Sequence, residues 1–530
     1  MSVVIGIDIG TQSTKGLVMD VTGRVIDSAS VSYKVETPHA LWAQQWPDVW
    51  LSAVKSVIHT LAHSDKFNAK EIKAITVSSL YGGSGIAVDE ECRALYPCLI
   101  WMDRRAEDEV EWIKTHVDLD RLKAITGNGV DSYYGYTKIL WVKNHQPEVW
   151  AKTRYFLPPN AYVQYWLTGN LAVDHSSAGN IGGVYDIKNR CWSVEALNML
   201  GIPVSMMPEH LVPSDHIVGY IDSEMALDLG LPSGVPIVAG GVDAAVATLA
   251  AGVVAPGCHV AMMGTSMCWG FLNPDVDAKH GLISMPHVAN ALEDNYIFGG
   301  AATAGASVSW FRDNFCQEEI RLASITGDDP HYLLEQQAKA ISPGAEGVLY
   351  LPYLMGERSP IWDPKASGTF VGLSLNSTRF HLYRAVLEGV AFALKHNIEC
   401  GQKGARVLDD ELIVVGGAAF SPLWVQIIAD VTGYPVRTIE EQVEAPLGGA
   451  FLAAKAVGLV SDYEQIKSWF SLSKAVMPNP LSVAHYEQLF DVYKSCYQNL
   501  KQDMHALKAL SQRVVELNQE PVAVPALEEA

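Results

Sequence analysis

The chain has 530 residues, of which 49% are hydrophobic, and a formal net charge of −21. This length exceeds one compact core, so two large domains are expected, and the apolar content excludes a disordered protein. The strong negative charge argues against a nucleic-acid partner. The eight cysteines form no CxxC pair, which indicates a reduced cytoplasmic chain without a disulfide framework or a zinc site.

The first third of the chain predicts an antiparallel meander followed by an α/β pattern. Runs rich in β-branched residues predict three strands separated by turns, at 3–7, 15–20 and 25–33. A helix is predicted over 46–63 and a strand over 72–78. The opening decapeptide has no basic leader, so no signal peptide is expected.

The middle of the chain repeats the opening device. Residues 235–239 predict a buried strand, and the apolar run 237–255 indicates a strand, a turn and a buried helix rather than a membrane span. The segment 257–272 then predicts a strand, a Gly-Thr turn and a second strand, as at the start. We interpret this recurrence as a diverged internal duplication.

The repeat suggests where the chain divides. We expect two large domains and a C-terminal helix with an acidic tail, at 1–240, 241–480 and 481–530. Within the second half, apolar periodicity predicts a buried strand at 412–415 and three helices, at 381–398, 422–433 and 447–457.

The two Gly-Thr turns, Gly10-Thr11 and Gly264-Thr265, are candidate phosphate sites. Glycine lets a phosphate approach the backbone, and the N–H groups and hydroxyls that follow can donate to its oxygens. One such turn alone is more often an ordinary hairpin. Two of them, each between buried strands, favour phosphate binding.

Asp8 lies in the apolar strand before the first turn, where an unpaired carboxylate is costly. A Mg²⁺ ion, bound directly or through water, would explain it. The alternative is a carboxylate that accepts hydrogen bonds from the turn itself.

Asp243 stands where a helix should begin, so it is either an N-cap or a catalytic base for a substrate hydroxyl, and the two roles are compatible. We expect the helix N-terminus to lower its pKa. A weak base suffices for phosphoryl transfer, which depends mainly on positioning. The chain lacks GxxxxGK[ST], a GxGxxG after the first strand, GxSxG and HExxH, which disfavours P-loop, Rossmann, serine-hydrolase and zincin interpretations.

Several stretches, in order along the chain, resemble the FGGY family of carbohydrate kinases; they include IGIDIGTQSTK, WMDRRA, YTKILWVKNHQPEVW, DHSSAGNIGG, GGVDAA, MMGTSM, LPYLMGERSPIWDP and VVGGAAFSPLW. The resemblance covers about residues 3 to 460. It implies an α/β fold with two ribonuclease-H-like (actin-like ATPase) domains flanking a catalytic cleft, and it implies ATP and Mg²⁺ as cofactors.

The resemblance also assigns roles to residues. It implies that Asp243 is the base and that Asp8 lies near Mg²⁺ and the γ-phosphate. The cofactor-binding residues it implies are Gly10, Thr11, Gln12, Ser13, Gly264, Thr265, Gly305, Gly416, Gly417 and Ala418. Asp103, in WMDRR, is implied as a substrate contact, with a helix cap as the alternative.

The loop at 79–84 departs from the family's specificity patterns. Glycerol kinases carry Arg-Glu here and xylulose kinases carry Met-His, whereas this chain reads SLYGGS. Tyr81 could stack on a sugar face and Ser84 could bind a hydroxyl, with Gly82 between them; a simple glycine-rich turn is the alternative. Other departures are Gly135 and Met267 within the family signatures.

The sequence therefore predicts an ATP-dependent kinase for a small carbohydrate, with a ketopentose of the xylulose or ribulose type as the leading substrate. A polyol of the glycerol or erythritol type and a sugar acid are the alternatives. From another class, a non-catalytic sugar sensor would have lost Asp8 and Asp243, and an Hsp70-like ATPase would need a further peptide-binding domain. No membrane partner is expected, and a homodimer is left open.

Overall fold

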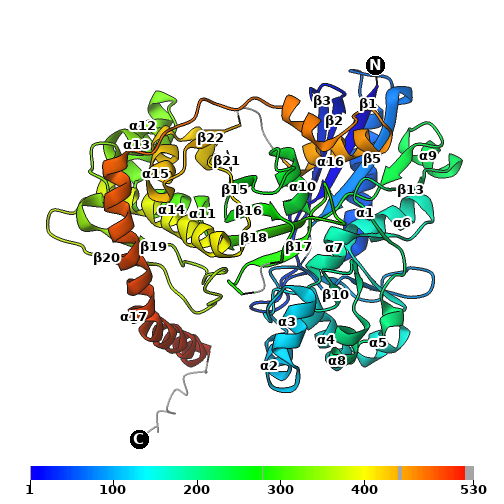
Figure 1. Cartoon of the computed structure of the whole chain (residues 1–530), viewed down its shortest axis with the longest axis horizontal. Helices are drawn as coiled ribbons and strands as arrows, with labels where there is room; N and C mark the ends of the chain where they lie inside the picture. Colours follow the sequence, from blue (N-terminus) through cyan, green and yellow to red (C-terminus); the bar gives the residue numbers. More distant parts are fainter. Residues whose placement is uncertain (1, 81, 277–278, 440–443, 520–530) are drawn as a thin grey trace, which may run out of the picture.

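Two six-stranded sheets organise the protein, one in each lobe of the computed structural model, which describes residues 2–80, 82–276, 279–439 and 444–519 (Figure 1). The first sheet has the order β13-β14-β5-β1-β2-β3. Its strands are β1 (Val3–Ile9), β2 (Ser13–Asp20), β3 (Val25–Ser32), β5 (Ile72–Ser79), β13 (Ile217–Tyr220) and β14 (Pro236–Val238).

The second sheet has the order β17-β18-β16-β15-β21-β22. Its strands are β15 (His259–Met263), β16 (Met267–Asn273), β17 (Ile283–Pro286), β18 (Asn295–Ala301), β21 (Leu412–Gly416) and β22 (Val436–Thr438). In both sheets a three-stranded antiparallel meander is followed by two strands parallel to its first strand. This shared order confirms the internal duplication and the two-domain α/β fold.

The first strand is buried on both faces, because helices cover the sheet on each side. Alternate residues Val3, Ile5 and Ile7 pack in one apolar cluster with helix α1 (Pro47–Ala62). Val4 points the other way, into the cluster that contains helix α16 (Ala445–Ala456). Strand alternation therefore turns Gly6 and Asp8 toward α16 as well.

Helix α16 lies against the first sheet although it comes late in the chain (Figure 1). A Cβ atom on Gly6 would lie 1.9 Å from the carbonyl oxygen of Pro446, so only glycine permits this approach. α16 also packs on α10 (Asp243–Ala250), which follows β14. Helices α10 and α16, which the predicted division assigns to the second domain, thus complete the first lobe, and the division at 240/241 stays a prediction.

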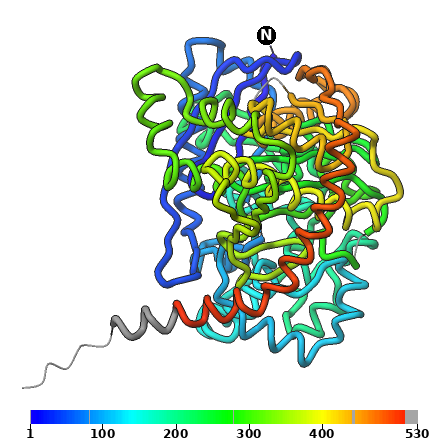
Figure 2. Tube along the Cα trace, turned by 90° about the vertical axis from the view of Figure 1, so that its left-hand side faces the viewer, coloured from blue at the N-terminus to red at the C-terminus, as the bar shows by residue number. Residues whose placement is uncertain are grey.

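The second sheet is covered by helices of its own half. They are α11 (Gly305–Phe315), α12 (Gln317–Thr326), α13 (Pro330–Ala338), α14 (Arg379–Gly404) and α15 (Pro422–Thr432). The long helix α17 (Pro480–Gln519) runs along the outside of this lobe (Figure 2). Tyr486, Phe490 and Tyr493 of α17 are buried in the core of the lobe.

The remaining elements lie mostly in the first lobe. Its helices are α2 (Glu107–His116), α3 (Leu119–Thr126), α4 (Gly135–His145), α5 (Pro147–Lys152), α6 (Pro159–Thr168), α7 (His175–Asn180), α8 (Val194–Leu200) and α9 (Ser223–Leu229). Short two-stranded pairs join β4 (Gln44–Gln45) to β7 (Cys98–Leu99), β6 (Ile86–Val88) to β8 (Tyr155–Leu157), β9 (Val173–Asp174) to β12 (Leu211–Val212), β10 (Tyr185–Asp186) to β11 (Cys191–Trp192), and β19 (Leu349–Leu351) to β20 (Thr369–Val371). Over the residues described, none of the helices combines the length and the apolarity that a membrane span requires.

Candidate active site

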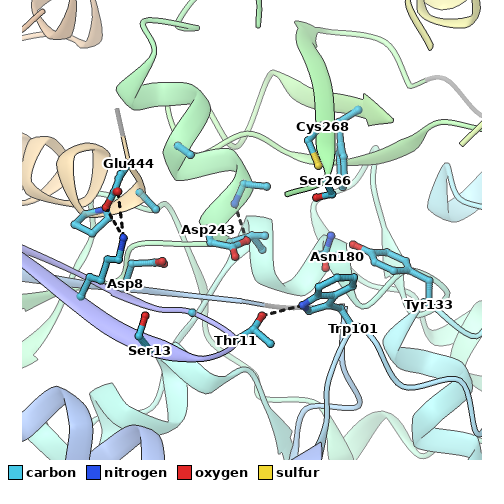
Figure 3. A pocket seen from close by; sticks show the side chains of 18 of the residues that line it. Asp8, Thr11, Ser13, Trp101, Tyr133, Asn180, Asp243, Ser266, Cys268 and Glu444 are labelled. Carbon is cyan, nitrogen blue, oxygen red and sulfur yellow. Dashed lines mark hydrogen bonds and ion pairs between the residues drawn. The ribbon is translucent and has the colours of Figure 1, made fainter. Parts of the chain in front are cut away.

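A cavity of about 450 Å³ opens between the lobes, where the β1–β2 turn faces the start of α10 (Figure 3). The sequence-predicted residues that line it are Asp8, Gly10, Thr11, Ser13 and Asp243. Asp243 lies more than 200 positions after the others in the chain, and the parallel pairing of β1, β5 and β14 brings the two segments together. The structure thus brings residues of both predicted domains into one polar site.

Asp8 sits on β1 opposite Lys15 of β2 and Ser78 of β5. Its Oδ1 atom is buried and has no hydrogen-bond partner among the described residues. Burial raises the pKa of this carboxyl well above its ordinary value, and the charges of Asp243 and Glu444 raise it further. Lys15, which pairs with Glu444 at 3.1 Å, acts weakly in the opposite direction.

An orphaned carboxylate oxygen on a cavity wall suits a hard cation. Across the part of the chain with described coordinates, no group of three or more His, Cys, Asp or Glu side chains could hold a metal by itself. Mg²⁺ does not require such a group, because it commonly keeps water and phosphate ligands beside one or two carboxylates. Asp8 therefore fits a Mg²⁺ ion that a nucleotide would help to hold.

Asp243 is the first residue of α10, and its Oδ1 accepts a hydrogen bond of 2.7 Å from the N–H of Ala244. The expectation that the helix end would lower its pKa is wrong. Burial raises the pKa of Asp243 to about 6, and the hydrogen bond from Ala244 offsets this only in part. Loss of water outweighs the helix end here, which makes Asp243 a stronger base than an exposed aspartate.

Trp101 ties the first turn to the neighbouring loop. Its indole Nε1 donates a 3.1 Å hydrogen bond to the hydroxyl oxygen of Thr11 (Figure 3). The N–H of Gly10 donates to the carbonyl of Ser13 and closes the turn. Gln12 is exposed and does not line the cavity, since only its carbonyl is engaged, by the N–H of Tyr33. Its role in phosphate binding stays a prediction.

The loop at 79–84, which was predicted to contact the sugar, lies behind residues that line the cavity. Gly82 approaches Trp101 and Tyr133 so closely that a Cβ would lie 3.1 Å from both side chains. Its carbonyl accepts a hydrogen bond of 2.6 Å from the buried ammonium of Lys138, which also donates to the Tyr133 carbonyl at 2.8 Å. Lys138 therefore fixes the two segments that flank Trp101. Tyr81 lies outside the described residues.

Ser84 and Asp103 are buried beneath this wall and do not line the cavity. The Ser84 hydroxyl donates to the Gly85 carbonyl at 2.6 Å and accepts from the N–H of Leu99. The Asp103 carboxylate accepts from the N–H of Ala43 and pairs with Arg105, with both side chains fully buried. Both residues hold the loops of the site in place, and direct contact with a substrate stays a prediction for each.

The further residues that line the cavity, and that were not predicted as site residues, include Trp101, Tyr133, Asn180, Cys268 and Arg358. Trp101, Asn180 and Arg358 stand within the stretches WMDRRA, DHSSAGNIGG and LPYLMGERSPIWDP, so the resemblance marked their segments without giving them a role. Cys268 follows the predicted turn at Gly264-Thr265 without having been given a role, and nothing in the residue pattern around Tyr133 indicated a site.

A second cavity, of about 600 Å³, lies in the C-terminal lobe and gathers most of the predicted nucleotide residues. Gly264, Thr265, Gly305, Gly417 and Ala418 line it, together with the aromatic side chains of Tyr332, Tyr383, Phe420 and Trp424. The N–H of Gly305 donates to the Gly264 carbonyl at 2.9 Å.

Gly416 precedes this wall with a φ of +88°, a conformation that glycine adopts without strain. It is not among the residues that line the cavity. Ser266 lines the first cavity and its neighbour Thr265 lines the second. The second Gly-Thr turn and the residue after it therefore border both cavities.

Comparison with known proteins covers nearly the whole chain. The N-terminal domain of the FGGY family of carbohydrate kinases matches residues 3–250, and its C-terminal domain matches residues 259–457. The chain is 31% identical to xylulose kinase of Lactococcus lactis, over 96% of this chain and 99% of that protein. It is 30% identical to gluconokinase of Bacillus subtilis, over 93% and 95%.

Solved structures agree with these matches. Ligand-bound xylulose kinase from Lactobacillus acidophilus superimposes with a TM-score of 0.86 at 26% identity, covering 94% of this chain and 99% of that one. The likeness includes both lobes.

Proposed function

This chain belongs to the FGGY family of carbohydrate kinases, and on that premise we propose that it transfers the γ-phosphoryl group of ATP to a hydroxyl of a ketopentose of the xylulose or ribulose type. The observation that carries the proposal is that one turn, Thr265-Ser266, borders two cavities. One cavity holds two half-buried carboxylates, Asp8 and Asp243, and the other has a glycine-lined, aromatic wall that suits an adenosine group.

Asp243 would act as the general base. Its carboxylate accepts a hydrogen bond from the substrate hydroxyl and takes the proton while the hydroxyl oxygen bonds to phosphorus and the bond to ADP breaks. The pKa of about 6 leaves Asp243 ionised at neutral pH yet more basic than an exposed carboxylate.

The two Gly-Thr turns would hold the phosphates from opposite sides. Thr11 donates from the first lobe, and the turn at Gly264 donates from the second. Asp8 would hold Mg²⁺, which supplies charge neutralisation for the phosphates when bound. Closure of the lobes would exclude water, which could otherwise accept the phosphoryl group.

A ketopentose is the leading substrate because the xylulose kinases match the chain over nearly all of its length. A sugar-acid kinase is the second candidate. The gluconokinase of B. subtilis is almost as similar, and the guanidinium of Arg358 on the cavity wall suits a carboxylate. We place the protein in the cytoplasm, and a homodimer remains compatible with the proposal.

A coupled ADP-release screen tests the proposal. The panel contains D-xylulose, D-ribulose, xylitol, glycerol, erythritol and D-gluconate, each with ATP and Mg²⁺. We expect ketopentose-dependent ADP release that Asp243→Ala abolishes while the variant still binds ADP. Turnover with D-gluconate alone would replace the ketopentose by the second candidate, and near-normal turnover of Asp243→Ala would overturn the mechanism.

A further inference from the structure

The catalytic cavity has a second wall, on the side away from Asp8. This wall carries polar atoms that have no role in the proposed phosphoryl transfer. In Figure 3, Asp243 lies between Asp8 on one side and Asn180, Tyr133 and Cys268 on the other. The electrostatic neighbours agree: Asp243 acts on both Asp8 and Tyr133. A substrate whose hydroxyl meets Asp243 must therefore extend along this second wall.

Asn180 presents an unsatisfied acceptor to this end of the cavity. The side chain is 1% exposed, and its Oδ1 is buried without a hydrogen-bond partner among the described residues. Its Nδ2 donates to the sulfur of Met285 at 3.3 Å, and the amide also interacts with the side chain of Tyr133. A buried acceptor left unpaired is costly, so Oδ1 is suited to receive a hydroxyl proton from a ligand.

Arg358 presents unsatisfied donors to the same region. Its Nη2 makes long contacts, to the carbonyls of Met267 at 3.3 Å and Ala301 at 3.4 Å and to the sulfur of Cys268 at 3.7 Å. Its Nε is buried and has no partner in the described part of the chain. A Cβ on Gly300 would lie 2.6 Å from Nη2, so the absence of a side chain there makes room for the guanidinium.

The charge of Glu357 acts on Arg358, but the Glu357 carboxylate does not bond to the guanidinium. Its Oε1 accepts from the backbone N–H groups of Ala302 and Arg358, both at 2.7 Å. Its Oε2 is buried and has no hydrogen-bond partner among the described residues. A half-buried arginine with long, weak contacts to its neighbours is prepared for an electron-rich atom from outside the chain.

The side chain is also held in place. The Ser359 hydroxyl accepts a 2.6 Å hydrogen bond from the N–H of Gly300, which pins the loop to strand β18. Trp362 of the same loop packs on Tyr133 and Tyr134 of the first lobe and donates to the Gly281 carbonyl at 2.6 Å. The guanidinium is therefore positioned before any ligand arrives, which limits the entropy lost on binding.

We propose that Arg358 and Asn180 form a subsite that reads the end of the sugar that is not phosphorylated: Arg358 donates to the ketose carbonyl oxygen, and Asn180 accepts from the neighbouring hydroxyl. This inference rests on the proposed function. A guanidinium has only donors, so it matches a carbonyl, which only accepts. A polyol places a hydroxyl there, whose oxygen can also accept from Arg358, but its proton then needs an acceptor that the guanidinium does not offer.

The structure thus assigns to Arg358 the discrimination of a ketose from the corresponding polyol. Hydrogen bonds to charged groups contribute about 1.5–3 kcal/mol, which corresponds to about 10- to 100-fold in affinity. Asn180 should not discriminate, because a ketose and a polyol both keep the terminal hydroxyl. The two residues therefore have separable effects on the same pair of ligands.

The test is isothermal titration calorimetry of the full-length protein with D-xylulose and with xylitol, for wild type, Arg358→Met, Arg358→Lys and Asn180→Leu. We expect wild type to bind D-xylulose about 10- to 100-fold more tightly than xylitol. In Arg358→Met this ratio should fall to within about threefold of unity, mainly through loss of D-xylulose affinity. Arg358→Lys should keep part of the ratio, and Asn180→Leu should weaken both ligands and keep the ratio.

Two controls separate this inference from the rest of the account. ADP affinity should be unchanged in every variant, because the nucleotide cavity contains neither residue. An equal loss for both ligands in Arg358→Met, or an unchanged ratio, would overturn the inference. If wild type binds D-gluconate and neither ketopentose, the proposed substrate fails; the subsite then stands only if Arg358→Met also loses D-gluconate.

Discussion

Replacing Asp243 by asparagine should make the ligand-free protein more stable. The pKa of Asp243 lies at about 6, against 3.8 for an ordinary aspartate, because burial disfavours its charge. Each pKa unit corresponds to about 1.4 kcal/mol, so at neutral pH the ionisable side chain costs about 3 kcal/mol of folding free energy. Asparagine removes the charge and keeps an oxygen that can accept from Ala244.

The gain should depend on pH in a defined direction. Because the folded pKa lies above the unfolded pKa, the destabilisation is absent below pH ~4, develops as pH rises from ~4 to ~6, and is constant above that. At pH 7.5 we expect the melting temperature of Asp243→Asn to exceed that of wild type by about 6–12 °C, given about 2–4 °C per kcal/mol for domains of this size. At pH 5 the difference should be about half as large.

Differential scanning calorimetry at the two pH values measures this, and Asp363→Asn is the matched control. Asp363 is also buried, but it accepts hydrogen bonds from Tyr497 and His505, at 2.8 and 2.7 Å, and its pKa is lowered. Its loss should therefore destabilise the protein at pH 7.5, and by less as pH falls toward its folded pKa. The reasoning would be refuted if Asp243→Asn melted at a lower temperature than wild type at pH 7.5. It would also be refuted if the difference in melting temperature were the same at both pH values.

Further predictions concern turnover and binding. The raised pKa of Asp243 predicts that kcat/KM falls on the acid side with an apparent pKa at least about one unit above the ~4 of an exposed aspartate; a limb at or below pH ~4 would exclude Asp243 as the base. Gly305→Ala should weaken ADP binding at least about tenfold, because its Cβ would lie 2.7 Å from the Gly264 carbonyl oxygen, and unchanged binding by calorimetry would contradict the assignment of the second cavity. Trp101→Phe removes the 3.1 Å hydrogen-bond donor to Thr11 and should lower kcat/KM about five- to tenfold without changing the melting temperature. Full activity would show that this hydrogen bond does not contribute to catalysis. Small-angle scattering should detect compaction when D-xylulose and a non-hydrolysable ATP analogue bind together, and no change would argue against lobe closure.

The strands and turns that build the site could be predicted because they are local. Apolar runs and Gly-Thr turns fix β1, β2, β15 and β16 from short stretches of sequence, and the recurrence of the pattern anticipates two equivalent sheets. The helix predicted over 46–63 is α1 (Pro47–Ala62), and the one over 422–433 is α15 (Pro422–Thr432). These elements are long, and their periodicity is strong.

Features that depend on packing between distant segments could not be predicted. Nothing near Gly6 shows that Pro446 will lie against it, and so the crossing of α16 to the first sheet was missed. The helix predicted over 381–398 is α14 (Arg379–Gly404), which extends further because tertiary contacts stabilise its last turns.

Catalytic and metal-binding roles could be predicted only for single residues that stand out in the sequence. Asp8 and Asp243 stand out because each carboxylate follows or ends a buried strand. The direction of the pKa shift of Asp243 was wrong, since a helix end is visible in a sequence and burial is not. Asn180 and Arg358 are candidates for substrate binding because each has a buried polar atom without a hydrogen-bond partner among the described residues. A missing partner can be recognised only in the three-dimensional structure.

The central claim is that the phosphoryl group passes to a sugar hydroxyl rather than to water. Phosphorus NMR of the purified protein with ATP, Mg²⁺ and D-xylulose or D-ribulose tests it most directly. The account predicts a new phosphomonoester resonance that grows in step with ADP and is absent with Asp243→Ala. Growth of inorganic phosphate alone, at the same rate with and without the ketopentose, would contradict it.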